Sequence, residues 1–220
     1  IELFGESSNR PPLIFIIHKF LNPFFLDELG FRRTVFGISL IIPVIFYFCL
    51  KEKFKGHNNY LLLLLSSVLF FNPFYRTSAF WGLEENYAII STLASLLFLL
   101  KLSSCDYNDK KLKWLLWYIF LITFFSSLTI YFDQKFLIIP LICFFKIIFS
   151  KQRNLIKLYC LILYCIFSVP YLFLIKIWGG VFPSNIFHVG SQFYFHHFGY
   201  ALTIIAFIFF PFIFLKNINI

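Results

Sequence analysis

Long apolar runs separated by short polar connections form the main pattern of this chain. A membrane-crossing helix needs roughly 17–25 mostly apolar residues. Stretches that satisfy this requirement lie at residues 34–50, 58–75, 113–132 after the leading lysine, 158–175 and 198–215. Polar and apolar residues do not alternate regularly, so helices are the expected way to satisfy the backbone in hydrocarbon.

Further apolar stretches are weaker candidates for spanning helices. Residues 86–100 become long enough if their helix begins near Phe80, and residues 11–26 and 136–149 each contain a lysine. Taken together, the pattern predicts an all-α membrane protein, a bundle of about eight transmembrane helices in one domain over residues 1–220. Short helices are expected in the connections on its outer face.

Prolines inside the apolar runs bear on the shape of these helices. Pro11 and Pro12 suit the first turn of a helix, where a missing N–H has no consequence. Pro43 and Pro140 lie within apolar runs and predict kinks, not helix ends.

The composition agrees with lipid as the main solvent of the chain. Hydrophobic residues make up 60% of the 220 residues, charged residues 13%, and phenylalanine alone contributes 35 positions. A soluble domain carries roughly a quarter charged residues. The chain begins at Ile1 and contains no methionine, so we expect a fragment whose first helix and first outer loop lie upstream.

The distribution of basic residues predicts the orientation in the membrane. The connections at 51–59, 101–113 and 146–157 and the tail after residue 215 carry three, four, four and one Lys or Arg, against three acidic residues in all. The remaining basic and acidic residues, seven of each, fall on the other side. Because cytoplasmic loops are enriched in Lys and Arg, the lysine-rich side is predicted to be cytoplasmic. The formal net charge of +9 then reflects topology and contact with the lipid bilayer, and no nucleic-acid partner is expected.

Polar residues on the predicted outer side are the candidates for chemistry. A carboxylate can take a proton from an acceptor hydroxyl, and a cationic side chain can neutralise a leaving phosphate. The candidate catalytic acids are Glu6, Glu84 and Glu85. Candidates for binding a donor or acceptor are Arg10, Arg33, Arg76, Gln134, Lys135, His188 and Gln192. The alternative role for each is that of a solvated anchor at a helix end.

A metal site is not predicted from this sequence. The five cysteines are scattered and form no CxxC pair, so they read as small apolar residues in membrane helices. His196 and His197 point to different faces of a helix, and His188 with Gln192 gives only one face. The sequence requires no cofactor, although a divalent metal ion that assists the reaction is compatible with it.

Several of these motifs carry a resemblance to a known superfamily. From Arg10 to Lys101 the chain resembles the GT-C superfamily of polytopic membrane glycosyltransferases, including protein O-mannosyltransferase-like members. The run Arg10-Pro11-Pro12-Leu13 matches the start of their second helix, Arg32 or Arg33 matches an arginine before the third, and residues 72–87 match an outer segment after a proline.

Later segments resemble the endoplasmic-reticulum glucosyltransferases that use dolichyl-phosphate glucose. Residues 132–135 (Phe-Asp-Gln-Lys) lie where that family has an aromatic-Arg-Gln-Thr turn, with Asp133 in place of the basic residue. Gly179-Gly180, His188 and residues 192–195 (Gln-Phe-Tyr-Phe) resemble a second conserved run. The acidic signature of the first outer loop would lie upstream of Ile1, and with it the principal catalytic acid.

The resemblance implies a glycosyltransferase that moves a sugar from a polyprenyl-phosphate-linked donor to a lipid-linked or other acceptor. The reaction would take place at the periplasmic or luminal face of a bacterial inner membrane or the endoplasmic reticulum. The alternatives are a transporter or flippase of lipid-linked saccharides and a membrane polysaccharide polymerase. A transporter is expected to carry charge midway along its helices or paired interrupted segments, neither of which the sequence shows.

Overall fold

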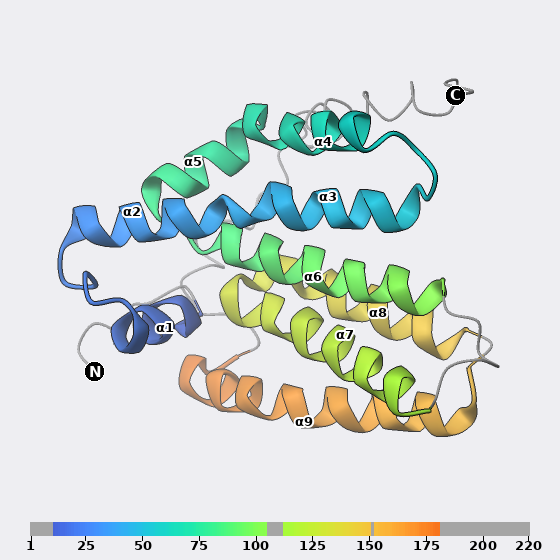
Figure 1. Ribbon diagram of the computed structural model, residues 1–220. Coiled ribbons are helices and arrows are strands. Elements are labelled where there is room, and N and C mark those ends of the chain that lie inside the picture. Colours follow the sequence, from blue (N-terminus) through green and yellow to red (C-terminus); the bar gives the residue numbers. More distant parts are fainter. Residues whose placement is uncertain (1–10, 105–111, 151, 181–220) are drawn as a thin grey trace, which may run out of the picture.

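The computed structural model describes residues 11–104, 112–150 and 152–180, and within these ranges every regular element is helical (Figure 1). The elements in chain order are α1 (Leu13–Leu21), α2 (Glu28–Ser39), α3 (Ile41–Lys53), α4 (Asn59–Ser67), η2 (Val68–Phe71), α5 (Pro73–Trp81), α6 (Glu85–Ser103), α7 (Leu112–Phe132), η3 (Gln134–Leu137), α8 (Ile138–Ile148) and α9 (Asn154–Trp178). The labels η2 and η3 denote 3₁₀ helices. The expectation of an all-α chain is confirmed for the described part.

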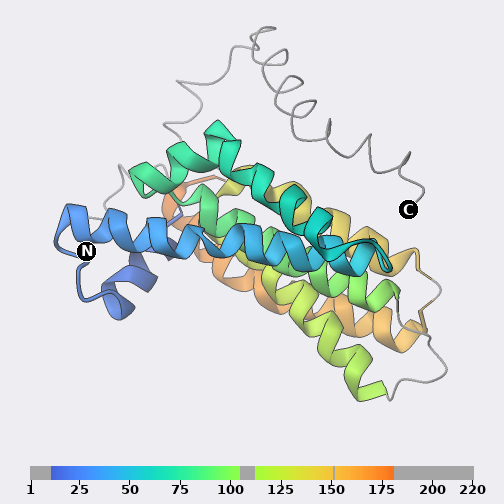
Figure 2. The same ribbon diagram turned by 45° about the horizontal axis from the view of Figure 1, so that its top comes forward.

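Helices α6 and α7 form the centre of the bundle. Helix α6 packs against α7 and α3, and α7 also packs against α9 and α8. Figure 1 shows α6 and α7 between α3 on one side and α9 on the other. In the turned view of Figure 2, the joined α2 and α3 cross in front of α6. The core between α7, α8 and α9 contains Ile119, Ile122, Ile147 and Cys160, each at most 1% exposed.

Small hydroxyl residues let the central helices approach closely. The buried members on α6 and α7 are Ser91, Ser95, Thr123, Ser126, Ser127 and Thr129. Such residues are enriched where membrane helices meet, because they permit close packing and donate to backbone carbonyls. Ser126 on α7 also forms a 2.8 Å hydrogen bond with the hydroxyl of Tyr164 on α9.

Four helical stretches are long and apolar enough to cross a membrane among the described residues. They are Glu28–Lys53, which joins α2 and α3, together with α6, α7 and α9. Only 11% of the most apolar window of α9 is buried within the protein, and a large exposed apolar face of this kind requires a partner other than water. By length and composition, these helices indicate an integral membrane protein.

The remaining sequence-predicted spans are shorter than expected. Residues 11–26 contain a nine-residue helix, residues 58–75 an apolar helix of 13 residues (Asn59–Phe71), and residues 136–149 the 11-residue α8. Two of these helices stop at an asparagine that precedes a proline. Asn22 and Asn72 both adopt extended backbone, since the following proline disfavours helical geometry there. Residues 198–215 lie outside the described residues.

Helix α6 also begins later than expected. It starts at Glu85, not near Phe80, because Gly82 takes a left-handed conformation (φ 70°) and ends α5. Its 19 residues extend to Ser103 at the other end, which gives it the length to span.

The prolines occupy the first turns of helices more often than their interiors. Pro43 and Pro140 are each the third residue of their helix, α3 and α8, and so lie at a helix start and not within a helix. Pro43 lacks the N–H that would bond to the carbonyl of Ser39, and that carbonyl accepts from the Tyr75 hydroxyl at 3.0 Å. A side chain from α5 therefore satisfies the group that the proline leaves free.

The described residues that flank the lysine-rich connections lie at one end of the bundle. Helices α3, α6 and α8 end there, and α7 and α9 begin there (Figure 1). The hydroxyl of Ser104 after α6 donates to Glu52 of α3 at 2.6 Å, which joins two of these connections directly. Successive connections between the helices therefore lie at alternate ends of the bundle, as the charge pattern predicts. Which end faces the cytoplasm stays a prediction.

Candidate functional site

Glu85 lies where α5, α6 and η3 meet, at the end of the bundle away from the lysine-rich connections. Its Oε2 accepts a 3.0 Å hydrogen bond from the Ser78 hydroxyl of α5, and its Oε1 lies 3.6 Å from Nζ of Lys135. The same ammonium lies 3.6 Å from Oδ2 of Asp133. Lys135 is thus held between two carboxylates that come from different segments.

Short local signals place these groups. The side chain of Asn72 accepts from the first N–H groups of α5, and Pro73 occupies the first helical position. Gly82 then ends α5, and a Cβ at this position would lie 3.1 Å from the ring of Phe31, so the turn is built for glycine. Glu85 follows as the first residue of α6, where the helix dipole favours a carboxylate.

The three charged side chains differ in their exposure to solvent. The side chains of Glu85 and Asp133 are 14% and 6% exposed, whereas that of Lys135 is 73% exposed. Asp133 also caps η3 by accepting from the N–H of Lys135 at 3.0 Å. The group therefore combines two shielded carboxylates, which can accept protons, with one accessible ammonium, which can contact an anion.

A cavity of about 580 Å³ lies on the opposite face of α5. Its walls include Phe36, Phe70, Tyr75, Phe80 and Trp81, and its cationic lining residue is Arg76. Among the described residues, no carboxylate lines this cavity. An aromatic cavity with a single guanidinium group has the chemistry to hold an apolar chain that ends in a phosphate.

Arg32 extends the basic character of this region. Its guanidinium carbon lies 4.8 Å from the centre of the Trp81 ring and it forms an ion pair with Glu28. Arg33, the residue selected from the sequence, is exposed on α2. The stacking on Trp81 makes Arg32, which the superfamily motif gave as the alternative, the better placed of the two.

A buried polar network connects the cavity wall to the interior. Asn86 is fully buried and donates through Nδ2 to the Ser39 hydroxyl at 2.8 Å and to the carbonyl of Tyr75 at 3.3 Å. The Tyr75 hydroxyl in turn donates to the Ser39 carbonyl, and burial raises the pKa of Tyr75 above its ordinary value of 10.0. These bonds fix the wall of the cavity to α2 and α6.

The structure brings part of the sequence-predicted set together. Glu84, Glu85, Gln134 and Lys135 share the end where α6 begins and η3 lies, and Glu84 and Gln134 are 6% and 9% exposed. Arg76 faces the separate cavity on α5. The predicted residues that lie outside the described part of the chain are Glu6, Arg10, His188 and Gln192.

His18 is a buried polar residue that the sequence reading did not select. Asn22 donates through Nδ2 to Nδ1 of His18 at 3.0 Å, since its Oδ1 accepts from the N–H of Phe24. Nε2 of His18 then carries the proton and donates to the Tyr87 hydroxyl at 2.6 Å. Burial lowers the pKa of His18 below its ordinary value of 6.5. The spacing of His18 and Asn22, one helical turn apart, was the available signal.

The described residues contain no group of three or more His, Cys, Asp or Glu side chains that could hold a metal ion. No protein-family model matches the chain, and neither a curated protein nor a solved structure matches it at a significant level. The function must therefore be argued from the residues themselves.

Proposed function

We propose that the chain is a glycosyltransferase that takes a sugar from a polyprenyl-phosphate-linked donor at the non-cytoplasmic face of a membrane. One observation carries the proposal: helix α5 joins the Glu85–Lys135 pair on one side to an aromatic cavity with Arg76 on the other. The resemblance of the Arg-Pro-Pro-Leu and residue 72–87 motifs to the GT-C superfamily supports the same reaction class.

The residues suit the two halves of such a transfer. A carboxylate accepts the proton of the acceptor hydroxyl, and the hydroxyl oxygen forms a bond to the anomeric carbon of the sugar. At the same time the bond from that carbon to the phosphate oxygen breaks. The leaving polyprenyl phosphate keeps the electron pair and is neutralised by Arg76 or Lys135. Aromatic walls contact the isoprenoid chain. Glu85 is the carboxylate placed to take this proton, with Glu6 in a supporting role.

A donor-turnover assay tests the proposal directly. The full chain is reconstituted in liposomes with a polyprenyl-phosphate hexose and candidate acceptors, and released polyprenyl phosphate is measured. Replacing Glu85 by Gln keeps the shape of the side chain and removes the negative charge. We expect about a 10²-fold loss of turnover, the scale seen when one stabilising polar group is removed.

Glu52→Gln is the matched control, because Glu52 is a half-buried carboxylate at the lysine-rich end. Equal turnover by wild-type protein and Glu85→Gln would contradict the role of Glu85. Passage of intact donor across the bilayer without release of polyprenyl phosphate would favour the transporter alternative. Release accompanied by growth of a sugar chain on a lipid-linked acceptor would favour a polymerase.

A further inference from the structure

A second cavity, of about 490 Å³, lies at the lysine-rich end between the last turns of α3, α6 and α8. Its polar lining consists of Lys53, Lys146, Gln152 and two serines, Ser103 and Ser150. The rest of the wall is almost wholly apolar and follows the last two turns of α3 and α6, with Phe46 and Leu96 at its inner edge. The cavity therefore combines two ammonium groups and one side-chain amide with a largely apolar wall.

Gln152 gives this cavity an unmet requirement for an acceptor. Gln152 is only 6% exposed, and its side-chain Nε2 has no hydrogen-bond partner among the described residues. A buried donor without an acceptor is unfavourable. Because Nε2 belongs to a residue that lines the cavity, an occupant with acceptor atoms would satisfy it.

The hydroxyl groups of the two serines already donate to backbone carbonyls, so they are not available to an occupant of the cavity. Ser103 donates to the carbonyl of Leu99 at 2.9 Å, and Ser150 donates to the carbonyl of Ile147 at 2.6 Å. The donors left for an occupant are the ammonium groups of Lys53 and Lys146 and the amide of Gln152. All three favour an anion.

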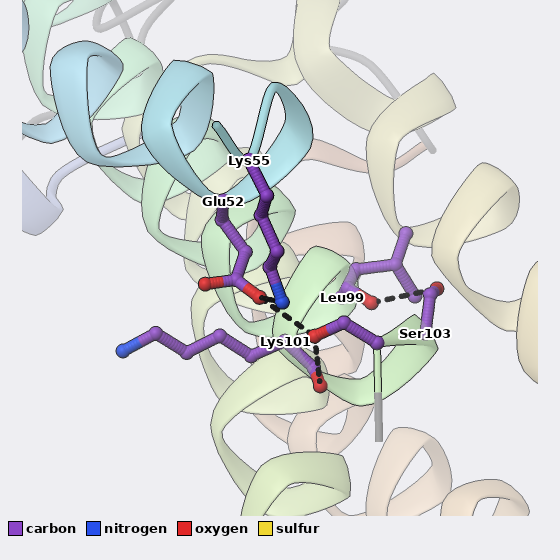
Figure 3. Close-up of polar contacts among 6 residues, drawn as sticks. Glu52, Lys55, Leu99, Lys101 and Ser103 are labelled. Carbon is purple, nitrogen blue, oxygen red and sulfur yellow. Dashed lines mark hydrogen bonds and ion pairs between the residues drawn. The ribbon is translucent and has the colours of Figure 1, made fainter. Parts of the chain in front are cut away.

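The neighbouring carboxylate does not neutralise these lysines. Figure 3 shows Glu52 beside Lys55, with its carboxylate directed at the Lys55 ammonium. Glu52 does not line the cavity. The two groups lie 2.8 Å apart, and Ser104 donates to the same carboxylate oxygen. Lys53 and Lys146 form no ion pair with a carboxylate among the described residues.

We propose that this cavity binds the anionic headgroup of a membrane phospholipid. The phosphate lies against Lys53, Lys146 and Gln152, and the first part of an acyl chain lies along the apolar wall. A lipid fits better than a free phosphate because phosphate alone would leave that wall uncovered. The site is independent of the proposed sugar transfer, since it lies at the other end of α3 from the Arg76 cavity.

The test is a lipid titration of the full chain in an uncharged detergent, with thermal unfolding as the readout. Dioctanoyl phosphatidylglycerol is expected to raise the unfolding temperature in a saturable manner. Dioctanoyl phosphatidylcholine and inorganic phosphate at the same concentrations are expected to leave it unchanged. Equal stabilisation by phosphatidylcholine would overturn headgroup selectivity, and equal stabilisation by inorganic phosphate would overturn the lipid assignment.

Variants locate the effect in the cavity. Lys53→Gln and Lys146→Gln should each weaken the apparent affinity for phosphatidylglycerol about fivefold, the contribution of one basic residue near an anionic lipid. Both lysines are exposed, so these variants are expected to fold. Gln152→Glu should weaken binding at least as much, because it replaces a donor by a like charge.

Lys51→Gln is the matched control, with the same charge change two residues away on α3. Lys51 does not line the cavity and lies over the ring of Tyr47 at 6.0 Å. The affinity of the Lys51→Gln variant for phosphatidylglycerol should equal that of the wild type. A loss in Lys51→Gln as large as in Lys53→Gln would overturn the proposal, since the effect would then come from net charge.

Discussion

At the end of the bundle where α5 meets α6, Glu85 and Asp133 share the ammonium of Lys135. At the other end, Lys53 and Lys146 face a cavity whose described lining contains no carboxylate. The first arrangement contains its own counter-charge, one ammonium between two carboxylates, and in the proposed reaction it can move a proton or contact a transient anion. The second lacks a counter-charge and is suited to a resident one. The same residue types therefore suit different proposed roles, according to whether a side chain of opposite charge lies beside them.

The largest expected difference between the ends is in sugar transfer. Arg76→Ala removes the guanidinium group from the aromatic cavity and should lower kcat/KM for donor turnover by about 10²-fold, because the leaving phosphate loses its counter-charge. Arg153→Ala removes an exposed guanidinium group at the lysine-rich end and should change turnover less than about twofold. The measurement is polyprenyl phosphate release under substrate-limited conditions. Similar losses in both variants would break the comparison.

The next effect concerns stability and depends on the buried network around Asn86. Asn86→Leu leaves the Tyr75 carbonyl and the Ser39 hydroxyl without their amide donor, so the free energy of unfolding should fall by about 1–3 kcal/mol. Asn154→Leu makes the same exchange at an exposed position at the start of α9 and should cost less than about 0.5 kcal/mol. Unfolding in mixed detergent and SDS micelles measures both.

The network prediction fails if Asn86→Leu is as stable as the wild type, because the polar bonds at this end would then contribute nothing. An intermediate result shared by both asparagine variants would point to a general effect of added hydrophobicity, and would also count against it.

A third effect is the pH dependence of stability at the end that contains His18. Burial lowers the pKa of His18, so between its folded pKa and about 6.5 the unfolded chain holds the extra proton. Stability is therefore full above about pH 6.5 and decreases as the pH falls, by at most about 1.4 kcal/mol per pH unit for one proton. Protonation at Nδ1 would also place an N–H against the amide donor of Asn22.

The same SDS unfolding, repeated between about pH 7.5 and 5.5, measures this slope. His18→Gln should flatten it, whereas His57→Gln should retain it, since His57 lies in the connection after α3 at the lysine-rich end. A slope that persists unchanged in His18→Gln would assign the pH dependence to another group.

The long helices α6, α7 and α9 were largely predictable from the sequence, and the short ones were not. Helices α6, α7 and α9 coincide with apolar runs whose ends carry polar residues. Residues 11–26 and 58–75 are also mainly apolar, but each contains an Asn-Pro pair that ends a helix. The stop signal was local and visible, and average hydropathy outweighed it in the prediction.

The sites were less predictable because they depend on packing between distant segments. Glu85 and Lys135 were both selected as polar residues on one side of the membrane, but nothing in the sequence paired them. Gln152 carries no sequence signal at all. Its importance comes from burial next to a cavity, which only the arrangement of α3, α6 and α8 creates.

The smallest predicted effect tests how α7 supports α9 next to Pro170, near the end of the bundle that contains Asp133. The Tyr131 hydroxyl donates to the carbonyl of Phe167 and accepts from the N–H of Tyr171, which are one turn apart next to Pro170. Tyr131→Phe removes this bridge and should lower the free energy of unfolding by about 0.6 kcal/mol, the average for a hydrogen bond between membrane helices. Tyr60→Phe, at a side chain that is 82% exposed, should have no measurable effect in the same SDS titration. If Tyr131→Phe matches Tyr60→Phe, the backbone groups of α9 around Pro170 need no side chain from α7, and this end of the bundle is stable without the bridge.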